Sequence, residues 1–225
     1  MEENLSNQPI TSENKIFGKT FFWMFLGLLG SAIIAWYTYS SGLFIDIVLG
    51  DYFNWLLILE LVVVLVFSLL FRKMSPTLVG ILYFVYAMIN GVTLSVIFAV
   101  FELSSIIYLF IVSAIIYGVL GIIGYKTDKD LTSWRPYLSV FLIAGIVLSI
   151  INIFIQNSAF ELFLDWAILI LFFGITIYDI NKIKLLQQEP NIDTEKIHIY
   201  CAMQLYLDFI NIFLRILSIF GKRRS

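Results

Sequence analysis

Two aspartates, Asp179 and Asp208, stand inside long apolar stretches of the chain. An acidic side chain at bilayer depth is costly, and such residues usually face a protein interior or a water-filled cavity. A close pair of carboxyl groups in such a place does not easily carry two charges, so it shares one proton and titrates as a unit. Without the proton, the pair repels itself or takes up a cation, and its oxygen atoms suit Ca²⁺. Alternatively, each aspartate makes a separate hydrogen bond between helices.

Several oxygen-bearing side chains near the two aspartates are candidates for supporting roles. They are Tyr178, Asn181, Tyr206 and Asn211. With these oxygen groups as neighbours, Asp179 and Asp208 are the candidate ligands of a calcium ion. Asn90 is a polar residue among apolar ones, and we expect it to bond a neighbouring helix.

Two further charges are candidates for a pore or a gate. Glu60 lies in the middle of an apolar stretch and could line a pore or bond another helix. Arg72 ends that stretch, either as a membrane anchor or as a counter-charge that closes over the aspartates. Three other acidic residues lie near the ends of apolar stretches, and we expect them to be solvated at the membrane surface. They are Glu102, Glu161 and Asp165.

The chain has one histidine, His198, and one cysteine, Cys201. A zinc site of histidine and cysteine needs about four ligands, so these two are too few. An intrachain disulfide is excluded. We expect His198 to be solvated at the membrane surface.

The composition is that of a polytopic membrane protein. Of the 225 residues, 60% are hydrophobic and 13% are charged, with a net charge of −2. Soluble domains have about 45–50% apolar and about 25% charged residues. These values exclude an ordinary soluble enzyme, a disordered chain and a basic nucleic-acid binder. We expect one transmembrane domain over residues 15–221, between a polar tail (1–14) and a short basic tail (222–225).

Seven stretches have the length of about 20 residues that a spanning helix needs. They are Thr20–Tyr39, Tyr52–Phe71, Leu78–Phe101, Ile106–Tyr125, Tyr137–Ile155, Phe160–Leu186 and Ile199–Phe220. Asp179 lies about 10 Å along the sixth helix from the surface at which the seventh begins, and Asp208 lies about 13 Å from that surface. The two carboxyl groups can therefore meet if the helices pack face to face.

Lysine and arginine occur at the N-terminus and in every second loop, and the other loops have none. This alternation places the N-terminus in the cytoplasm. The tail Lys222-Arg223-Arg224 disagrees, because seven full spans put it outside. We therefore expect either a seventh full span despite its tail or a segment that enters and returns, and we favour the full span.

The last two stretches resemble the Bax inhibitor-1 (TMBIM, YccA-like) family. The residues that carry the likeness are Phe173–Ile183, with Tyr178-Asp179, and Ala202–Leu214, with its Leu-Tyr-Leu-Asp-x-Ile-Asn-x-Phe run. The resemblance implies an all-α membrane fold in which six helices surround a central C-terminal helix. It also implies a pH-sensitive calcium leak, whose aspartate pair maps onto Asp179 and Asp208. Glu60 and Arg72 are the nearest matches to an acid and an arginine at the family's gate.

From residues and resemblance together we predict a bacterial-type calcium leak of the plasma membrane, gated by the Asp179–Asp208 pair. Ca²⁺ is the expected transported ion, and we expect no permanently bound cofactor, no nucleic acid and no enzymatic activity. The alternative is a non-conducting regulator that binds a membrane protease or a stress or cell-death partner. The acidic tail Met1–Asn14 is the feature that could reach such a partner.

Overall fold

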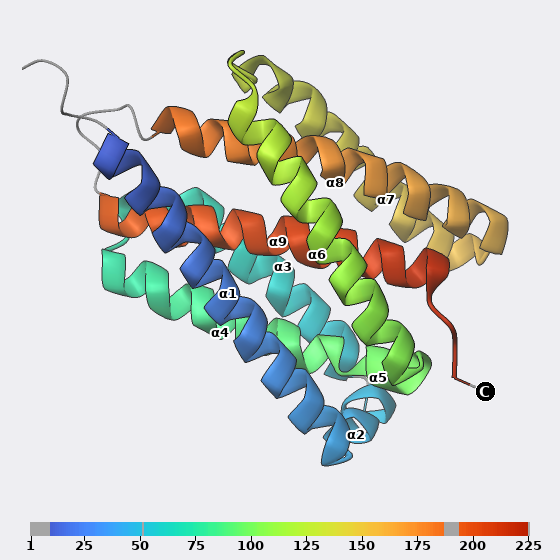
Figure 1. The fold of residues 1–225 in the computed structure, drawn as a ribbon. Coiled ribbons are helices and arrows are strands. Elements are labelled where there is room, and N and C mark those ends of the chain that lie inside the picture. Colours follow the sequence, from blue (N-terminus) through green and yellow to red (C-terminus); the bar gives the residue numbers. More distant parts are fainter. Residues whose placement is uncertain (1–9, 51, 187–193, 225) are drawn as a thin grey trace, which may run out of the picture. The chain divides into compact units, whose positions relative to one another are not determined.

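The computed structural model describes residues 10–50, 52–186 and 194–224, and these are almost entirely helical (Figure 1). The polar tail that we expected to reach a partner falls largely outside them. The elements in chain order are α1 (Ile10–Ser40), α2 (Leu43–Leu49), α3 (Tyr52–Leu70), η1 (Phe71–Lys73), α4 (Pro76–Leu94), α5 (Val96–Val100), α6 (Leu103–Lys126), η2 (Thr132–Trp134), α7 (Arg135–Ile155), α8 (Ser158–Leu186) and α9 (Thr194–Phe220).

The seven predicted membrane spans are confirmed, with boundaries that move by a few residues. Seven helical spans within the described residues are long and apolar enough to cross a membrane. They are Phe17–Ser40, Tyr52–Leu70, Pro76–Val100, Leu103–Lys126, Thr132–Ile155, Ser158–Leu186 and Ile197–Phe220. The third is interrupted at Ser95, whose Oγ donates to the carbonyl of Val92 at 2.6 Å. The last span lies in one unbroken helix, so it contains no turn at which the chain could return.

The helices gather into two compact units, and α9 belongs to both. The first unit comprises Met1–Ala99 and Leu186–Tyr206, and the second comprises Val100–Leu185 and Leu207–Ser225. The last span is the most deeply packed of the seven, since 56% of its apolar window is buried, against none for Thr132–Ile155. The chain thus buries the helix that carries Asp208.

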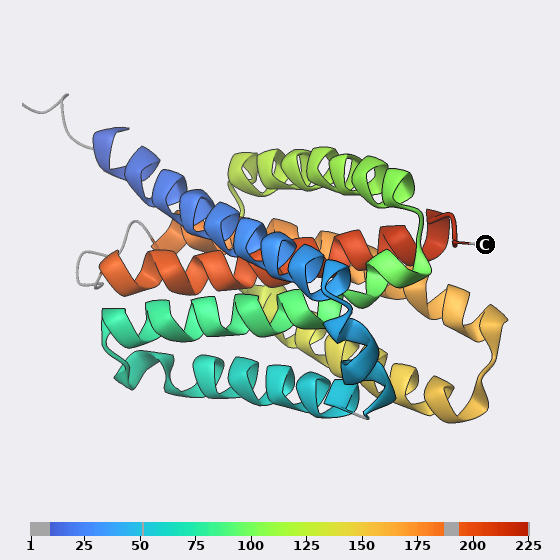
Figure 2. The ribbon, with the colours of Figure 1, turned by 90° about the horizontal axis from the view of Figure 1, so that it is seen from below.

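In the first unit, α4 packs against both α1 and α3. Figure 2 shows α3 and α4 lying side by side. Ser75 caps α4 by accepting a hydrogen bond from the Leu78 amide, and Pro76 opens the helix at a position that needs no amide donor. Gly91 lets α4 approach α1 closely, because a Cβ there would lie 2.7 Å from the carbonyl oxygen of Ser31.

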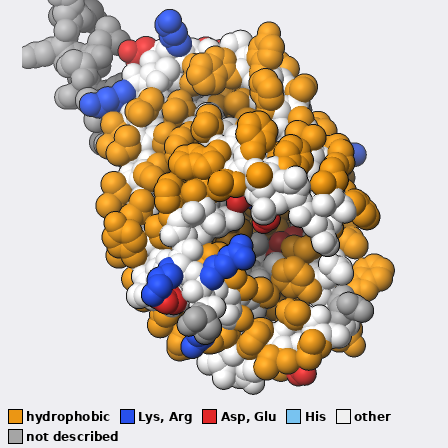
Figure 3. All heavy atoms as spheres, turned by 90° about the vertical axis from the view of Figure 1, so that its right-hand side faces the viewer, with side chains coloured by type: hydrophobic (Ala, Val, Ile, Leu, Met, Phe, Trp, Pro, Cys, Tyr) orange, Lys and Arg blue, Asp and Glu red, His pale blue; other side chains and the backbone are white. Residues whose placement is uncertain are grey.

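The second unit contains α6, α7, α8 and the later part of α9. Gly145 of α7 faces Ile168 of α8, and the two helices run side by side in Figure 1. The ring of Phe209 in α9 packs edge-on against Phe110 and Tyr117 of α6. Large apolar side chains such as Ile143, Phe154 and Ile170 are exposed, as expected where lipid replaces water. Figure 3 shows apolar side chains over much of one face, with charged side chains grouped in its middle and lower part.

Candidate functional site

Asp179 of α8 and Asp208 of α9 both lie in the second unit, and both are buried. Their side chains retain 5% and 2% of their exposed area. The charge of Asp179 acts on Asp208, and the ammonium group of Lys182 acts on both carboxyl groups. Tyr117 of α6 lies within electrostatic range of both aspartates. Three helices of one unit therefore bring these groups together in the interior.

One oxygen of this pair lacks a donor. No N–H or O–H group of the described residues donates a hydrogen bond to Oδ2 of Asp208, although this atom is fully buried. A buried polar atom without a partner is costly. A proton held between two carboxyl groups would supply the missing donor, so the arrangement suits a pair that shares one.

The oxygen-bearing side chains that were expected to support the two aspartates mostly form hydrogen bonds with other groups. Asn181 donates to the carbonyls of Thr127 and Lys129 and accepts from the amide of Leu131, so it holds the α6–α7 loop. Asn211 donates to Leu207 of its own helix at 2.8 Å. Tyr178 is buried and lies within electrostatic range of Asp179. Both ends of the Asn181 amide are engaged by the loop, and a supporting role for Asn181 at the aspartates stays a prediction.

The α6–α7 loop has a further internal bond. The backbone amide of Thr132 donates to Asp130 Oδ1 at 2.8 Å. This bond holds the pKa of Asp130 below its ordinary value of 3.8, because it favours the charged carboxylate. The bond is therefore present at neutral pH and is lost only as the pH falls through that lowered pKa.

In the first unit, a chain of buried hydrogen bonds joins four helices. The hydroxyl of Tyr206 lies 2.7 Å from Ser31 Oγ and donates to Asn90 Oδ1 at 2.8 Å. Asn90 also bonds Glu60, which accepts from Thr93 Oγ1 at 2.6 Å. Asn90 thus bonds neighbouring helices, as expected, and Glu60 bonds another helix. The side chain of Arg72, within η1, lies outside the described part of the structure.

A second polar cluster joins α8 to α9. Asp165 Oδ1 accepts from Arg215 at 2.5 Å, and Asp165 Oδ2 accepts from Ser218 Oγ at 2.5 Å. Asp165 retains only 3% of its exposed area, so its predicted solvation at the surface is wrong. The physical reason is that Arg215, which is also intramembrane, supplies a counter-charge. Both residues were visible in the sequence as charges within apolar stretches, and that signal could have suggested their pairing.

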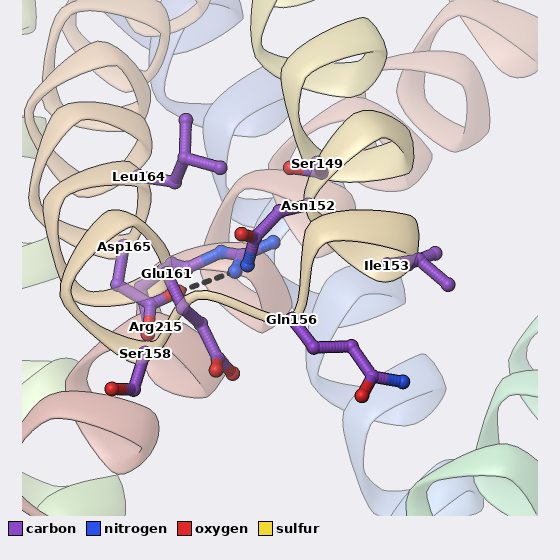
Figure 4. A pocket seen from close by; sticks show the side chains of 9 residues that line it. All are labelled: Ser149, Asn152, Ile153, Gln156, Ser158, Glu161, Leu164, Asp165 and Arg215. Atoms are coloured by element: carbon purple, nitrogen blue, oxygen red, sulfur yellow. Dashed lines mark hydrogen bonds and ion pairs between the residues drawn. The ribbon is translucent and has the colours of Figure 1, made fainter.

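A cavity of about 380 Å³ opens beside this ion pair. Figure 4 shows its lining, which comes from the end of α7 and the residue that follows it, the beginning of α8 and one residue of α9. The lining residues are Ser149, Asn152, Ile153, Gln156, Ser158, Glu161, Leu164, Asp165 and Arg215.

The remaining candidates are distributed along the chain. Glu161 is exposed, as expected, whereas Glu102 is paired with Lys222 at 2.7 Å. His198 is buried rather than solvated, because it faces inward from the packed α9. Within the part of the chain that the structure describes, no three residues of histidine, cysteine, aspartate and glutamate gather as a metal site.

Comparison with known proteins gives the family. Residues 13–225 match the family model described as "Inhibitor of apoptosis-promoting Bax1". The chain is 34% identical to "Inner membrane protein YbhL" of Escherichia coli (strain K12), covering 96% of this chain and 95% of that protein. It is 30% identical to an uncharacterized protein of Borreliella burgdorferi, covering 97% and 96%. These matches, with seven membrane-spanning helices, show that the chain is an integral membrane protein and belongs to the Bax inhibitor-1 family.

Proposed function

We propose that this protein is a calcium leak of the membrane whose opening is controlled by the protonation of Asp179 and Asp208. With one shared proton, the carboxyl groups hold α8 and α9 together. When the pH rises and the proton leaves, two buried negative charges repel each other and attract a cation. Separation of the helices then opens a path lined by oxygen atoms, which suit Ca²⁺.

The observation that carries this proposal is the buried pair itself. Asp208 Oδ2 has no donor among the described residues, and the nearby positive charge that acts on the pair belongs to Lys182. A membrane protein rarely keeps two acids at such depth without a use for them, since each is costly in a low-dielectric interior. A shared proton would give that oxygen the donor that it lacks among the described residues.

The test is calcium flux into liposomes that hold the purified protein, measured from pH 6 to pH 8. We expect flux to rise with pH, by at most about tenfold per pH unit, because one proton is released. If the wild-type protein passes no calcium at any pH in this range, the proposed function is wrong.

The gating role is tested by Asp208→Asn. Asparagine imitates the protonated acid and can still donate to Asp179, so we expect the variant to stay closed and its flux at pH 8 to resemble that of the wild type at pH 6. Asp46→Asn is the matched control, because Asp46 lies exposed on α2 and its loss should leave the pH profile unchanged. A wild-type pH profile in Asp208→Asn would refute gating by this pair.

A further inference from the structure

The cavity of about 380 Å³ beside the Asp165–Arg215 ion pair lies far along α8 from the aspartate pair. We call it the distal cavity, lined by the nine residues labelled in Figure 4. Asp165 precedes Asp179 by fourteen residues, which is about 21 Å of helix. The two polar clusters therefore stand at different depths of the second unit.

Helical spacing nevertheless places both clusters on the same interface between α8 and α9, which we call the seam. Asp165 and Asp179 differ by fourteen residues on α8, and Asp208 and Arg215 differ by seven on α9. Because seven residues make almost two full turns, each pair lies close to one face of its helix. The face of α8 that meets α9 at the aspartates meets it again at the Asp165–Arg215 ion pair, and the distal cavity opens at that second meeting.

The charges of the distal cavity favour a cation. Its lining contains two acids, Glu161 and Asp165, and one base, Arg215, so the formal charge is −1. Arg215 neutralises Asp165, which leaves the exposed carboxylate of Glu161 to face the cavity with no ion-pair partner among the described residues.

Two buried atoms of the cavity also lack partners among the described residues. Asn152 Oδ1 accepts no hydrogen bond, and Arg215 Nε donates none. Water can serve both atoms, since it donates and accepts. The cavity volume holds several waters, because each occupies about 30 Å³ of liquid. A cation that keeps its hydration shell therefore fits this lining better than a bare ion, which would need more oxygen ligands than one free carboxylate supplies.

We propose that the distal cavity is a vestibule that binds a hydrated cation before it enters the α8–α9 seam, and that Arg215 competes with this cation for Asp165. The proposal rests on the proposed calcium leak and extends it to the other end of the seam. Arg215 is about one-third exposed. Its guanidinium can therefore shift toward Glu161, one helical turn from Asp165, when a cation takes its place.

The first test compares two acids of the second unit. Glu161→Gln removes the free carboxylate of the distal cavity, whereas Glu102→Gln removes an acid that is paired with Lys222 outside it. In the flux assay at pH 8 and low salt, we expect Glu161→Gln to raise the calcium concentration for half-maximal flux by about three- to tenfold, and 0.5 M salt to abolish the difference. Equal effects of the two variants would overturn the vestibule.

The second test needs no flux. Ser149→Cys places a thiol in the distal cavity, and Ser41→Cys places one at the exposed turn that follows α1; both variants also carry Cys201→Ala. Each protein, in lipid nanodiscs, is treated with two methanethiosulfonate reagents. One carries a cationic trimethylammonium group, and the other carries an anionic sulfonate group. We expect the ratio of cationic to anionic rates to be about tenfold higher at position 149 than at 41, and to fall with Glu161→Gln.

The two tests separate the two proposals. Equal rate ratios at positions 149 and 41, in a protein that still leaks calcium with pH, would overturn the vestibule and leave the leak standing. A raised ratio at position 149, in a protein that passes no calcium, would overturn the leak while supporting a cation-binding cavity.

Discussion

At the scale of single residues, we expect Arg215 to have a large influence on stability. It pairs with Asp165, whose side chain is only 4% exposed, and a buried acid without its counter-ion is strongly unfavourable. We expect Arg215→Met to lower the free energy of unfolding by about 3 kcal/mol. This value is at the lower end of the losses expected when a buried ion pair is broken, because Arg215 is partly exposed. Thermal unfolding in detergent measures this loss.

A second substitution shows whether charge is the cause. If the loss comes from an uncompensated carboxylate, Asp165→Asn added to Arg215→Met should recover a large part of it. If the two losses simply add, the interaction is not electrostatic and the assignment of Arg215 as counter-ion is incorrect.

At the scale of elements, close helix approach depends on particular glycines. A Cβ at Gly124 of α6 would lie 2.7 Å from the carbonyl oxygen of Ile177 in α8, whereas a Cβ at Gly121 would meet nothing within 4 Å. We expect Gly124→Ala to cost about 1–3 kcal/mol of stability, because backbone must move. Gly121→Ala should change stability by less than about 1 kcal/mol. Thermal unfolding of both variants measures the difference, and equal losses would contradict the close contact.

The spans could be predicted because the bilayer fixes their length, so every long apolar run became a helix. The common depth of Asp179 and Asp208 followed from the constant rise of a helix. Helix rotation could not be predicted, because these runs are apolar all round and a helix without a polar face does not reveal which side is buried. The partners of Asp165 and of Asn181 were missed for this reason. The short α2 and the break at Ser95 were missed because neither carries a proline or a charge run.

For the whole molecule, the contradiction between the basic tail and the seven spans has a structural answer. The tail is bound to the corner between α5 and α6. The Glu102 amide donates to the Lys222 carbonyl at 3.0 Å, and the Arg224 amide donates to Val100 at 2.9 Å. The Lys222 ammonium meets the Glu102 carboxylate at 2.7 Å. The tail therefore lies on the same side of the membrane as this corner, and part of its charge is neutralised.

This contact predicts the side of the C-terminus. The loop between the third and fourth spans has no lysine or arginine, so the positive-inside rule places it outside, together with the tail that it binds. Alkaline phosphatase fused after Ser225 should be active, and green fluorescent protein at the same position should stay dark. The same reporters fused to the N-terminus should give the opposite result, because that end is expected in the cytoplasm. Ser104→Cys, in the same corner, should be labelled by an impermeant reagent added from outside. If the C-terminus is cytoplasmic while Ser104→Cys is labelled from outside, the contact between the tail and this corner does not exist. If both are cytoplasmic, the contact stands and the assigned topology is inverted.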